Sequence, residues 1–217
     1  MTTTKRALER RLSAVEGFSD PIVEREQYPT PADVAAGLIH LADISGDVAD
    51  RTVVDLGTGT GMLAIGAALR SPERVLAIDI DPVAIRDGQR NERRVSPETP
   101  IEWIRADATR APICPSDRDS PHTAPIIVVM NPPFGAQRGN VHADRAFLET
   151  AVEIGVVSYS IHNEGSQEFV EAFTADEGGE ITHAYRVPIA LERQFSFHDR
   201  DRREIETELY RIVWDSR

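Results

Sequence analysis

Short apolar runs alternate with helical patterns through the middle of the chain. Five runs have the length and composition of buried strands, at residues 52–56, 75–80, 101–106, 126–130 and 156–160. Segments with apolar residues spaced three or four apart follow most of these runs and predict helices. Parallel strands need crossover helices between them, so the alternation predicts a parallel sheet with helices on both faces.

The segments before and within this alternation carry further signals. Apolar spacing predicts helices at 5–16 and 30–43, with Thr30 as the N-cap of the second helix and Pro31 as its first helical residue. Residues 110–125 contain four prolines among polar residues, which is typical of a surface loop.

The C-terminal third predicts a helix near 167–173 and two antiparallel strands at 181–187 and 205–214. We therefore expect one α/β domain over residues 1–217. Its core, residues 46–217, would be a Rossmann-like, doubly wound, seven-stranded sheet with an antiparallel C-terminal strand. Residues 1–45 would form an N-terminal helical extension.

The composition narrows the class of protein. With 41% hydrophobic and 28% charged residues, the chain fits a soluble globular domain. No apolar run approaches the ~18 residues of a membrane span, and the polar N-terminus is unlike a secretory signal. The single cysteine, Cys114, excludes a disulfide framework, and the six histidines lack metal-ligand spacing. We expect a cytoplasmic protein without a metal centre.

The charge has two interpretations. The formal net charge is −12, and the 24 basic residues comprise one lysine, Lys5, and 23 arginines. A negative surface disfavours nucleic acid as a partner. Alternatively, an acidic and lysine-poor surface is an adaptation to high internal salt, which screens the repulsion. The even spread of the acidic residues favours the second interpretation, a halophilic protein, and net charge is then a poor guide to partners.

A glycine-rich turn and three aspartates predict a ligand site. Residues 57–61 have the spacing G-x-G-x-G between a strand and a helix, and no lysine follows as it would in a phosphate-binding loop. Asp55 could pair with an ammonium group, Asp79 with two ribose hydroxyls and Asp107 with an adenine amino group. These features suit a cationic adenosine without a phosphate, such as S-adenosylmethionine. A turn needed only for packing, or a nicotinamide dinucleotide site, are the alternatives.

The segment Asn131-Pro132-Pro133-Phe134 directly follows an apolar strand, at the edge where open α/β sheets bind ligands. Two consecutive prolines stiffen the turn. The Asn131 side-chain oxygen and the Pro132 carbonyl could both accept hydrogen bonds from one amino group and turn its lone pair toward a methyl donor. Phe134 could stack on a planar target. The alternative is an Asn-Pro turn with an aromatic plug.

Together these motifs resemble the class I S-adenosylmethionine-dependent methyltransferases that methylate amino groups. More narrowly, the chain is similar to the methyltransferase-like family that methylates adenine N6 in small-subunit ribosomal RNA. The resemblance runs almost end to end. It rests on the combination of Gln27–Thr30 with Asn131–Phe134, and it includes Tyr159–His162 and the Phe197-His198 pair.

The resemblance implies a site when it is combined with the glycine turn and the aspartates. The catalytic turn would be Asn131, Pro132, Pro133 and Phe134. The cofactor contacts would be Gln27, Tyr28, Thr30, Asp55, Gly57, Thr58, Gly59, Thr60, Gly61, Met62, Asp79, Ile80, Asp107, Ala108 and Asn131. Eukaryotic members of the family also work with a small zinc-binding activator protein, so a heterodimer with an archaeal-type equivalent is expected. His162 and His198 lie in family-like segments and are candidates for the target side.

The predicted function is transfer of a methyl group from S-adenosylmethionine to adenine N6 in RNA, with ribosomal RNA as the expected substrate. The chain departs from the family in three places: threonines at 58 and 60 where relatives often have cysteine, the long loop 110–125, and the acidic stretch 199–208. The last departure weakens the inference of RNA binding. N-methylation of a protein glutamine or of guanine N2 remains open, as does a non-catalytic assembly subunit.

Overall fold

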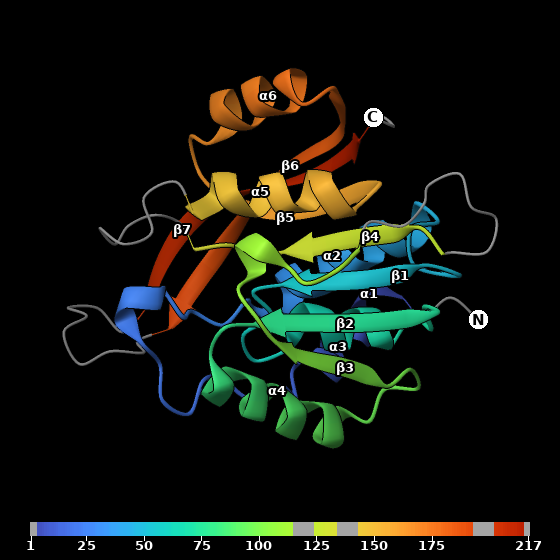
Figure 1. The fold of residues 1–217 in the computed structure, drawn as a ribbon. Helices are drawn as coiled ribbons and strands as arrows, with labels where there is room; N and C mark the ends of the chain where they lie inside the picture. The colour runs from blue at the N-terminus through green and yellow to red at the C-terminus, as the bar shows by residue number, and fades with distance from the viewer. Residues whose placement is uncertain (1–3, 115–123, 134–142, 193–201, 215–217) are drawn as a thin grey trace.

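The computed structural model describes residues 4–114, 124–133, 143–192 and 202–214 (Figure 1). The helices are α1 (Lys5–Leu12), α2 (Ala32–Ile44), α3 (Met62–Ala68), α4 (Pro82–Val95), α5 (Ala143–Ile154) and α6 (Gln167–Asp176), with short 3-10 turns at Val23–Arg25 and Ala108–Arg110. The strands are β1 (Thr52–Leu56), β2 (Arg74–Asp79), β3 (Ile101–Arg105), β4 (Ile126–Met130), β5 (Val157–Asn163), β6 (Gly179–Glu192) and β7 (Arg202–Trp214).

The seven strands form one sheet in the order β3-β2-β1-β4-β5-β7-β6. Strands β1 to β5 are parallel, while β7 is antiparallel to both β5 and β6. The predicted fold class is confirmed. The order reverses between β1 and β4, and at such a switch point the carboxyl ends of the strands leave room for a ligand.

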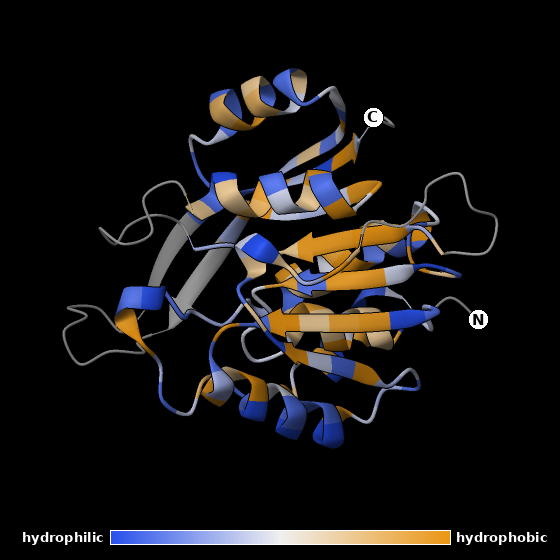
Figure 2. Ribbon diagram, in the orientation of Figure 1, coloured by the Kyte–Doolittle hydropathy of each residue, from blue (hydrophilic) through white to orange (hydrophobic). Residues whose placement is uncertain are grey.

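Helices cover both faces of the sheet (Figure 1). Helices α1, α2 and α3 pack on one face, and α5 and α6 pack on the other. Successive residues of a central strand enter different cores: Val53 of β1 faces the first group of helices and Val54 faces the second. Because both faces are buried, these strands are apolar over most of their length (Figure 2), as the sequence pattern indicates.

Most predicted elements match the observed ones to within a few residues, and the differences have local causes. Helix α1 ends at Leu12, not near residue 16, because Ala14 and Val15 form tighter i→i−3 hydrogen bonds to the carbonyls of Arg11 and Leu12. Strands β6 and β7 are longer than predicted because they pair with each other well beyond the end of β5. None of the helices in the described ranges is long and apolar enough to cross a membrane. The division into one domain with an N-terminal extension stays a prediction.

A buried polar cluster joins the antiparallel end of the sheet to the connection between α2 and β1. The Tyr159 hydroxyl donates to Asp47 Oδ2 at 2.5 Å, and Arg211 donates to the same oxygen from Nε at 2.9 Å. Burial raises the pKa of Tyr159, and the hydrogen bond to Asp47 adds to this effect, so the phenol stays a neutral donor. The Asp47 carboxylate thus holds together segments more than a hundred residues apart.

We expect Asp47→Ala to lower the free energy of unfolding by about 3 kcal/mol, because it leaves the buried guanidinium of Arg211 without its carboxylate. Tyr159→Phe should cost about 1–2 kcal/mol, since it removes the hydroxyl that donates to Asp47 and accepts from Arg211 but leaves the ion pair in place. Urea unfolding of both variants measures the difference. Glu102→Ala, which breaks the solvent-exposed ion pair with Arg74, is the control and should have little effect. Equal losses in Asp47→Ala and Glu102→Ala would contradict this account.

Candidate active site

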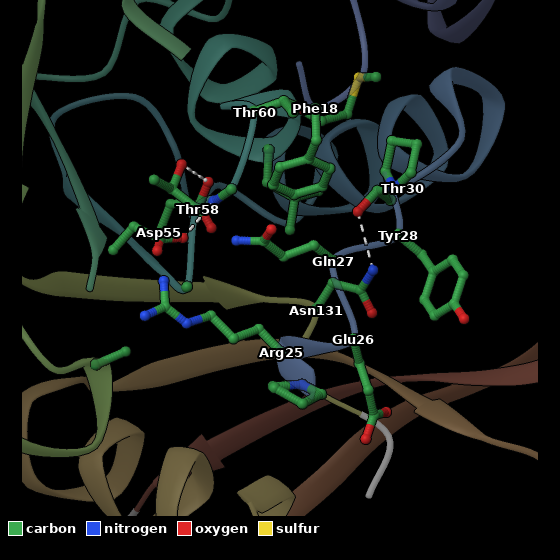
Figure 3. Close-up of a pocket in the computed structure, with 18 of the residues that line it drawn as sticks. Phe18, Arg25, Glu26, Gln27, Tyr28, Thr30, Asp55, Thr58, Thr60 and Asn131 are labelled. Carbon is green, nitrogen blue, oxygen red and sulfur yellow. Dashed lines mark hydrogen bonds between the residues drawn. The ribbon is translucent and has the colours of Figure 1, made fainter. Parts of the chain in front are cut away.

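A pocket lies at the carboxyl ends of β1, β2 and β4, closed on one side by residues 18–30 (Figure 3). Most of the residues predicted as cofactor contacts line it: Gln27, Tyr28, Thr30, Asp55, Gly57, Thr58, Gly59, Thr60, Met62, Asp79, Ile80, Asp107, Ala108 and Asn131. Of the predicted catalytic turn, Asn131 and Pro133 line the pocket. Pro132 is buried outside it, and Phe134 lies outside the described residues.

The glycine turn presents bare backbone to this pocket. Gly57 and Gly59 have φ values of 67° and 55°, which residues with a Cβ rarely adopt. A Cβ on Gly59 would come within 2.9 Å of the Phe18 ring, and one on Gly57 within 2.9 Å of the Phe147 ring. The two rings therefore pack directly against the turn. Gly61, also predicted as a contact, is the N-cap residue just before α3, and it does not line the pocket.

The side chain of Asp55, near the end of β1, is hydrogen-bonded to the glycine turn and to α3. Its Oδ2 accepts hydrogen bonds from the Thr58 hydroxyl at 2.7 Å and from the Ala64 backbone N–H, in the first turn of α3, at 2.9 Å. Burial raises the pKa of Asp55 to about 7, against the opposing effect of these hydrogen bonds. Asp55 Oδ2 thus stabilises the glycine turn by bonding it to α3. The role predicted for the carboxylate, toward an ammonium group, would come in addition to this structural one.

Asp79 is held at the end of β2 by two backbone donors. Its Oδ2 accepts from Gly59 N–H and its Oδ1 from Asp81 N–H, both at 2.8 Å. Each carboxylate oxygen keeps further acceptor capacity, which suits a pair of vicinal hydroxyls. Burial raises the pKa of Asp79. The side chain of the next residue, Ile80, is 51% exposed at the pocket and offers an apolar surface to a planar ring.

Asp107 caps the short turn after β3. Its Oδ1 accepts from the Thr109 backbone N–H at 2.9 Å and from the Thr109 hydroxyl at 2.8 Å. The residue is exposed and lines the pocket beside the buried Ala108. Asp55, Asp79 and Asp107 make the pocket acidic, and Arg25, which also lines it, forms an ion pair with Asp81 at 3.2 Å. A cationic ligand without a phosphate fits this charge.

We call residues 16–30 the N-terminal strap, because they run along α4 and then along the pocket. The strap is bound to buried polar side chains of α4. Glu16 N–H donates to Asn91 Oδ1 at 3.0 Å, and Ser19 N–H donates to Asp87 Oδ2 at 2.8 Å. Asn91 also donates to the Thr60 carbonyl at 3.0 Å, so one amide ties the strap to the glycine turn.

Gln27 fastens the middle of the strap. Its Nε2 donates to Asp81 Oδ2 and its Oε1 accepts from Ile22 N–H, both at 2.8 Å. Burial acts to raise the pKa of Asp81. Hydrogen bonds from Gln27 and Val83 and the charge of Arg25 outweigh burial, so the pKa is lowered. Gln27 was predicted as a cofactor contact. Its amide is engaged at both ends within the protein, so it shapes the pocket wall as well as lining it.

Thr30 corrects one prediction. The N-cap of α2 is Pro31, which has an extended backbone, and no side chain caps this helix. The Thr30 hydroxyl instead accepts a hydrogen bond from Asn131 Nδ2 at 2.9 Å (Figure 3). A contact across 101 residues therefore replaces the expected local capping bond, and it gives the NH₂ group of a partly buried amide its acceptor.

The side-chain oxygen of Asn131 differs from the side-chain nitrogen, which is hydrogen-bonded to Thr30. Asn131 Oδ1 is buried and has no hydrogen-bond partner among the described residues. A buried acceptor without a donor costs ~1–3 kcal/mol, so its position on the pocket wall calls for a ligand that donates. The amide group of a substrate or the exocyclic amine of a nucleobase supplies such a donor. The acceptor role predicted for this oxygen fits the structure.

Several pocket residues had no predicted role: Phe18, Arg25, Glu26, Pro29, Leu63 and Phe147. Neither Phe18 nor Phe147 has a spacing in the sequence that marks it as a residue of the pocket wall. Of the two histidines that are candidates for the target side, His162 does not lie at the pocket. His162 is buried beside Ser160, and burial lowers its pKa to about 4. His198 lies outside the described residues.

No group of three potential metal ligands occurs in the described ranges. Residues 115–123, 134–142 and 193–201 lie outside these ranges, so the absence of a metal site from the chain stays a prediction.

Comparison with known proteins identifies the lineage of this site. The family model of the ribosomal protein L11 methyltransferase (PrmA) matches residues 39–132, which include the glycine turn, Asp79, Asp107 and Asn131. The chain is 34% identical to protein MJ0284 of Methanocaldococcus jannaschii over 96% of its own length and 93% of that protein. It is 29% identical to the rRNA N(6)-adenosine-methyltransferase Mettl5 of Drosophila melanogaster, over 95% of each chain.

A solved structure agrees with the sequence comparison. The crystal structure of the "putative RNA methyltransferase PH1948" of Pyrococcus horikoshii superimposes with a TM-score of 0.86, at 35% identity, over 100% of both chains. The similarity therefore extends through the N-terminal strap and the antiparallel end of the sheet as well as the glycine turn. The chain belongs to the methyltransferase family that includes PH1948 and MJ0284.

Proposed function

We propose that this methyltransferase transfers the methyl group of S-adenosylmethionine to the exocyclic N6 amine of an adenine in ribosomal RNA, with the small-subunit RNA as its substrate. The buried Oδ1 of Asn131, which has no hydrogen-bond partner among the described residues, carries the proposal, because it calls for a donor on the target. The acidic pocket supports the choice of methyl donor, which is a cationic adenosine without a phosphate. The relatives named rRNA N(6)-adenosine-methyltransferase support the choice of target.

In this proposal Asp79 accepts from both ribose hydroxyls, Ile80 packs on the adenine ring and Asp107 accepts from its amino group. Asp55 lies near the ammonium group of the methionine part. The bound donor supplies a methyl group on a sulfonium, which needs no further activation. Asn131 Oδ1, with the carbonyl of Pro132, accepts hydrogen bonds from the target NH₂ and draws its lone pair out of the ring system.

The target nitrogen then forms its bond to the methyl carbon as the bond from carbon to sulfur breaks, which releases S-adenosylhomocysteine. The methylated nitrogen, now cationic, loses one proton to water. Positioning and hydrogen bonding by the protein are sufficient for this step, and a strong base is not required. Phe134 remains the proposed stacking partner for the target base. A small zinc-binding activator protein remains a proposed partner, on the family resemblance alone.

Methylation of a protein is the second candidate, since the matching family model is named for a ribosomal protein methyltransferase. That match ends at residue 132 and covers the cofactor half of the fold. The relatives that match over nearly the whole chain, including its C-terminal strands, are named for RNA adenosine instead. We therefore favour RNA.

Replacing Asn131 tests the proposed chemistry. We expect Asn131→Ala to slow methyl transfer to deproteinised ribosomal RNA by ~100-fold or more, because the target amine loses a positioned acceptor. Its affinity for S-adenosylmethionine should stay within a few-fold of wild type. Nucleoside mass spectrometry detects the product, and calorimetry measures the affinity. Full turnover in the variant would contradict the mechanism. In a parallel assay of the wild type with labelled S-adenosylmethionine and whole ribosomal subunits, label that appears only in ribosomal protein would favour the second candidate.

Asp55 should make cofactor binding depend on pH. Its pKa of about 7 means that much of the free protein carries a protonated Asp55 below neutral pH. An ammonium group favours the ionised form, so we expect binding to tighten as pH rises from about 5.5 to 7.5, with release of a proton. S-adenosylhomocysteine, which has the ammonium but not the sulfonium, isolates this effect. Calorimetry in two buffers of different ionisation enthalpy counts the protons, and an unchanged affinity across this range would refute the assignment.

Gln27→Glu tests the strap. The substitution keeps the shape but places a second carboxylate against the buried Asp81, so we expect a Tm loss and at least ~10-fold weaker binding of S-adenosylmethionine. Gln167→Glu is the matched control, because it also faces a carboxylate, that of Glu171, but on an exposed helix surface. Thermal unfolding with and without cofactor measures both. If the two variants behave alike, Gln27 does not hold the pocket wall.

A further inference from the structure

The side chain of Asn131 is held at one end only. Its Nδ2 donates to Thr30 Oγ1 at 2.9 Å, and its Oδ1 is buried without a partner in the described part of the chain (Figure 3). An amide can rotate about its last bond and exchange the places of oxygen and nitrogen. The exchange would present two donors to the target where the proposed reaction needs an acceptor. Whatever fixes this rotation decides which atoms the site can recognise.

The restricted conformation of Thr30 suits it to fix the rotation of the Asn131 amide. The residue lies between Pro29 and Pro31, and a proline restricts both its own φ and the backbone of the residue before it. The side chain is only 8% exposed, and its β-branch restricts χ1. The hydroxyl oxygen therefore has a nearly fixed position, with an acceptor lone pair on the side of Asn131.

Thr30 also connects this amide to the rest of the pocket wall. It ends the N-terminal strap, whose other bonds run to Asp81, the N-cap of α4, and to Asp87 and Asn91 within that helix. The bond from Asn131 uses the Thr30 oxygen as an acceptor, so the hydroxyl hydrogen is left for another acceptor, such as the carboxylate of a bound methyl donor. The orientation of Asn131 is thus linked to the strap.

We propose that Thr30, with its hydroxyl hydrogen directed to the bound methyl donor and its oxygen to Asn131 Nδ2, is a positioning residue that locks the Asn131 amide with its oxygen toward the target. It thereby restricts the target to groups that donate, such as an exocyclic NH₂. The inference rests on the proposed function and goes beyond the cofactor contact that the family resemblance gives to Thr30. Ring nitrogens that carry no hydrogen and carbonyl oxygens, which only accept, are rejected because Asn131 Oδ1 would stay unpaired against them.

The kinetic test compares Thr30→Val, which keeps the shape and removes the acceptor, with Thr30→Ser, which keeps the hydroxyl. At saturating S-adenosylmethionine, we expect the single-turnover rate on ribosomal RNA to fall ~10–100-fold in Thr30→Val and to stay within a few-fold in Thr30→Ser. Adding Thr30→Val to Asn131→Ala should cause little further loss, since the two residues act through one group. A Thr30→Val variant with weaker cofactor binding and an unchanged saturated rate would overturn the proposal.

A spectroscopic test does not depend on activity. The chain has four asparagines, Asn91, Asn131, Asn140 and Asn163, so selective ¹⁵N labelling gives four side-chain NH₂ signals. The Asn131→Ala spectrum assigns the relevant one. We expect one Asn131 Nδ2 proton to exchange slowly in wild type and in Thr30→Ser, and quickly in Thr30→Val. The buried Asn91 amide, which donates to the carbonyls of Glu16 and Thr60, is the internal control for folding.

The two tests separate the possible failures. If wild-type protein methylates no RNA, the proposed function fails, while the amide spectra still decide whether Thr30 locks Asn131. If Asn131 exchange is the same in wild type and Thr30→Val while Asn91 stays protected, the positioning role is wrong whatever the substrate is.

Discussion

Two desolvated carboxylates hold the glycine turn, and the geometry of the site depends on them. Asp55 binds the Thr58 hydroxyl and a backbone N–H of α3, and Asp79 binds the backbone N–H of Gly59. Burial raises the pKa of both, so the protein places negative charge where water solvates it poorly. This cost is offset in part by the turn's own donors. A cationic ligand lowers it further, which explains how one arrangement of residues both shapes the turn and selects the charge of the ligand.

The N-terminal strap has a comparable structural role on the other side of the pocket. Its bonds to Asp87 and Asn91 of α4 are partly buried and link segments about seventy residues apart. Because Asn91 also binds the Thr60 carbonyl, and Thr30 binds Asn131, the strap spans from the cofactor turn to the proposed catalytic turn. The residues before the first strand therefore belong to the active site and do more than extend the fold.

The sequence predicted the sheet almost completely, because parallel strands buried on both faces leave apolar runs that local turns delimit, as at 52–56 and 126–130. The three aspartates Asp55, Asp79 and Asp107 also lie together as predicted, since the carboxyl ends of parallel strands meet at one edge of the sheet. The partners of polar side chains were harder to predict. Thr30 satisfies every local rule for an N-cap, yet its partner is Asn131, and Gln27 binds Asp81. Spacing along the chain carries no information about bonds across 54 or 101 residues.

The cofactor side of the site contains ionisable carboxylates, whereas the side chains on the target side do not ionise. The cofactor half is built from Asp55, Asp79 and Asp107, and Asp55 changes charge near neutral pH. The target half is built from Asn131, Thr30 and prolines, none of which ionises. A carboxylate at position 131 would add a further charge to an acidic pocket, and burial would favour its protonated form, which donates where an acceptor is required. A neutral amide with a fixed orientation avoids this conflict. It keeps the acceptor at every pH at which the protein folds, so that pH acts on the binding of the methyl donor and leaves the recognition of the amine unchanged.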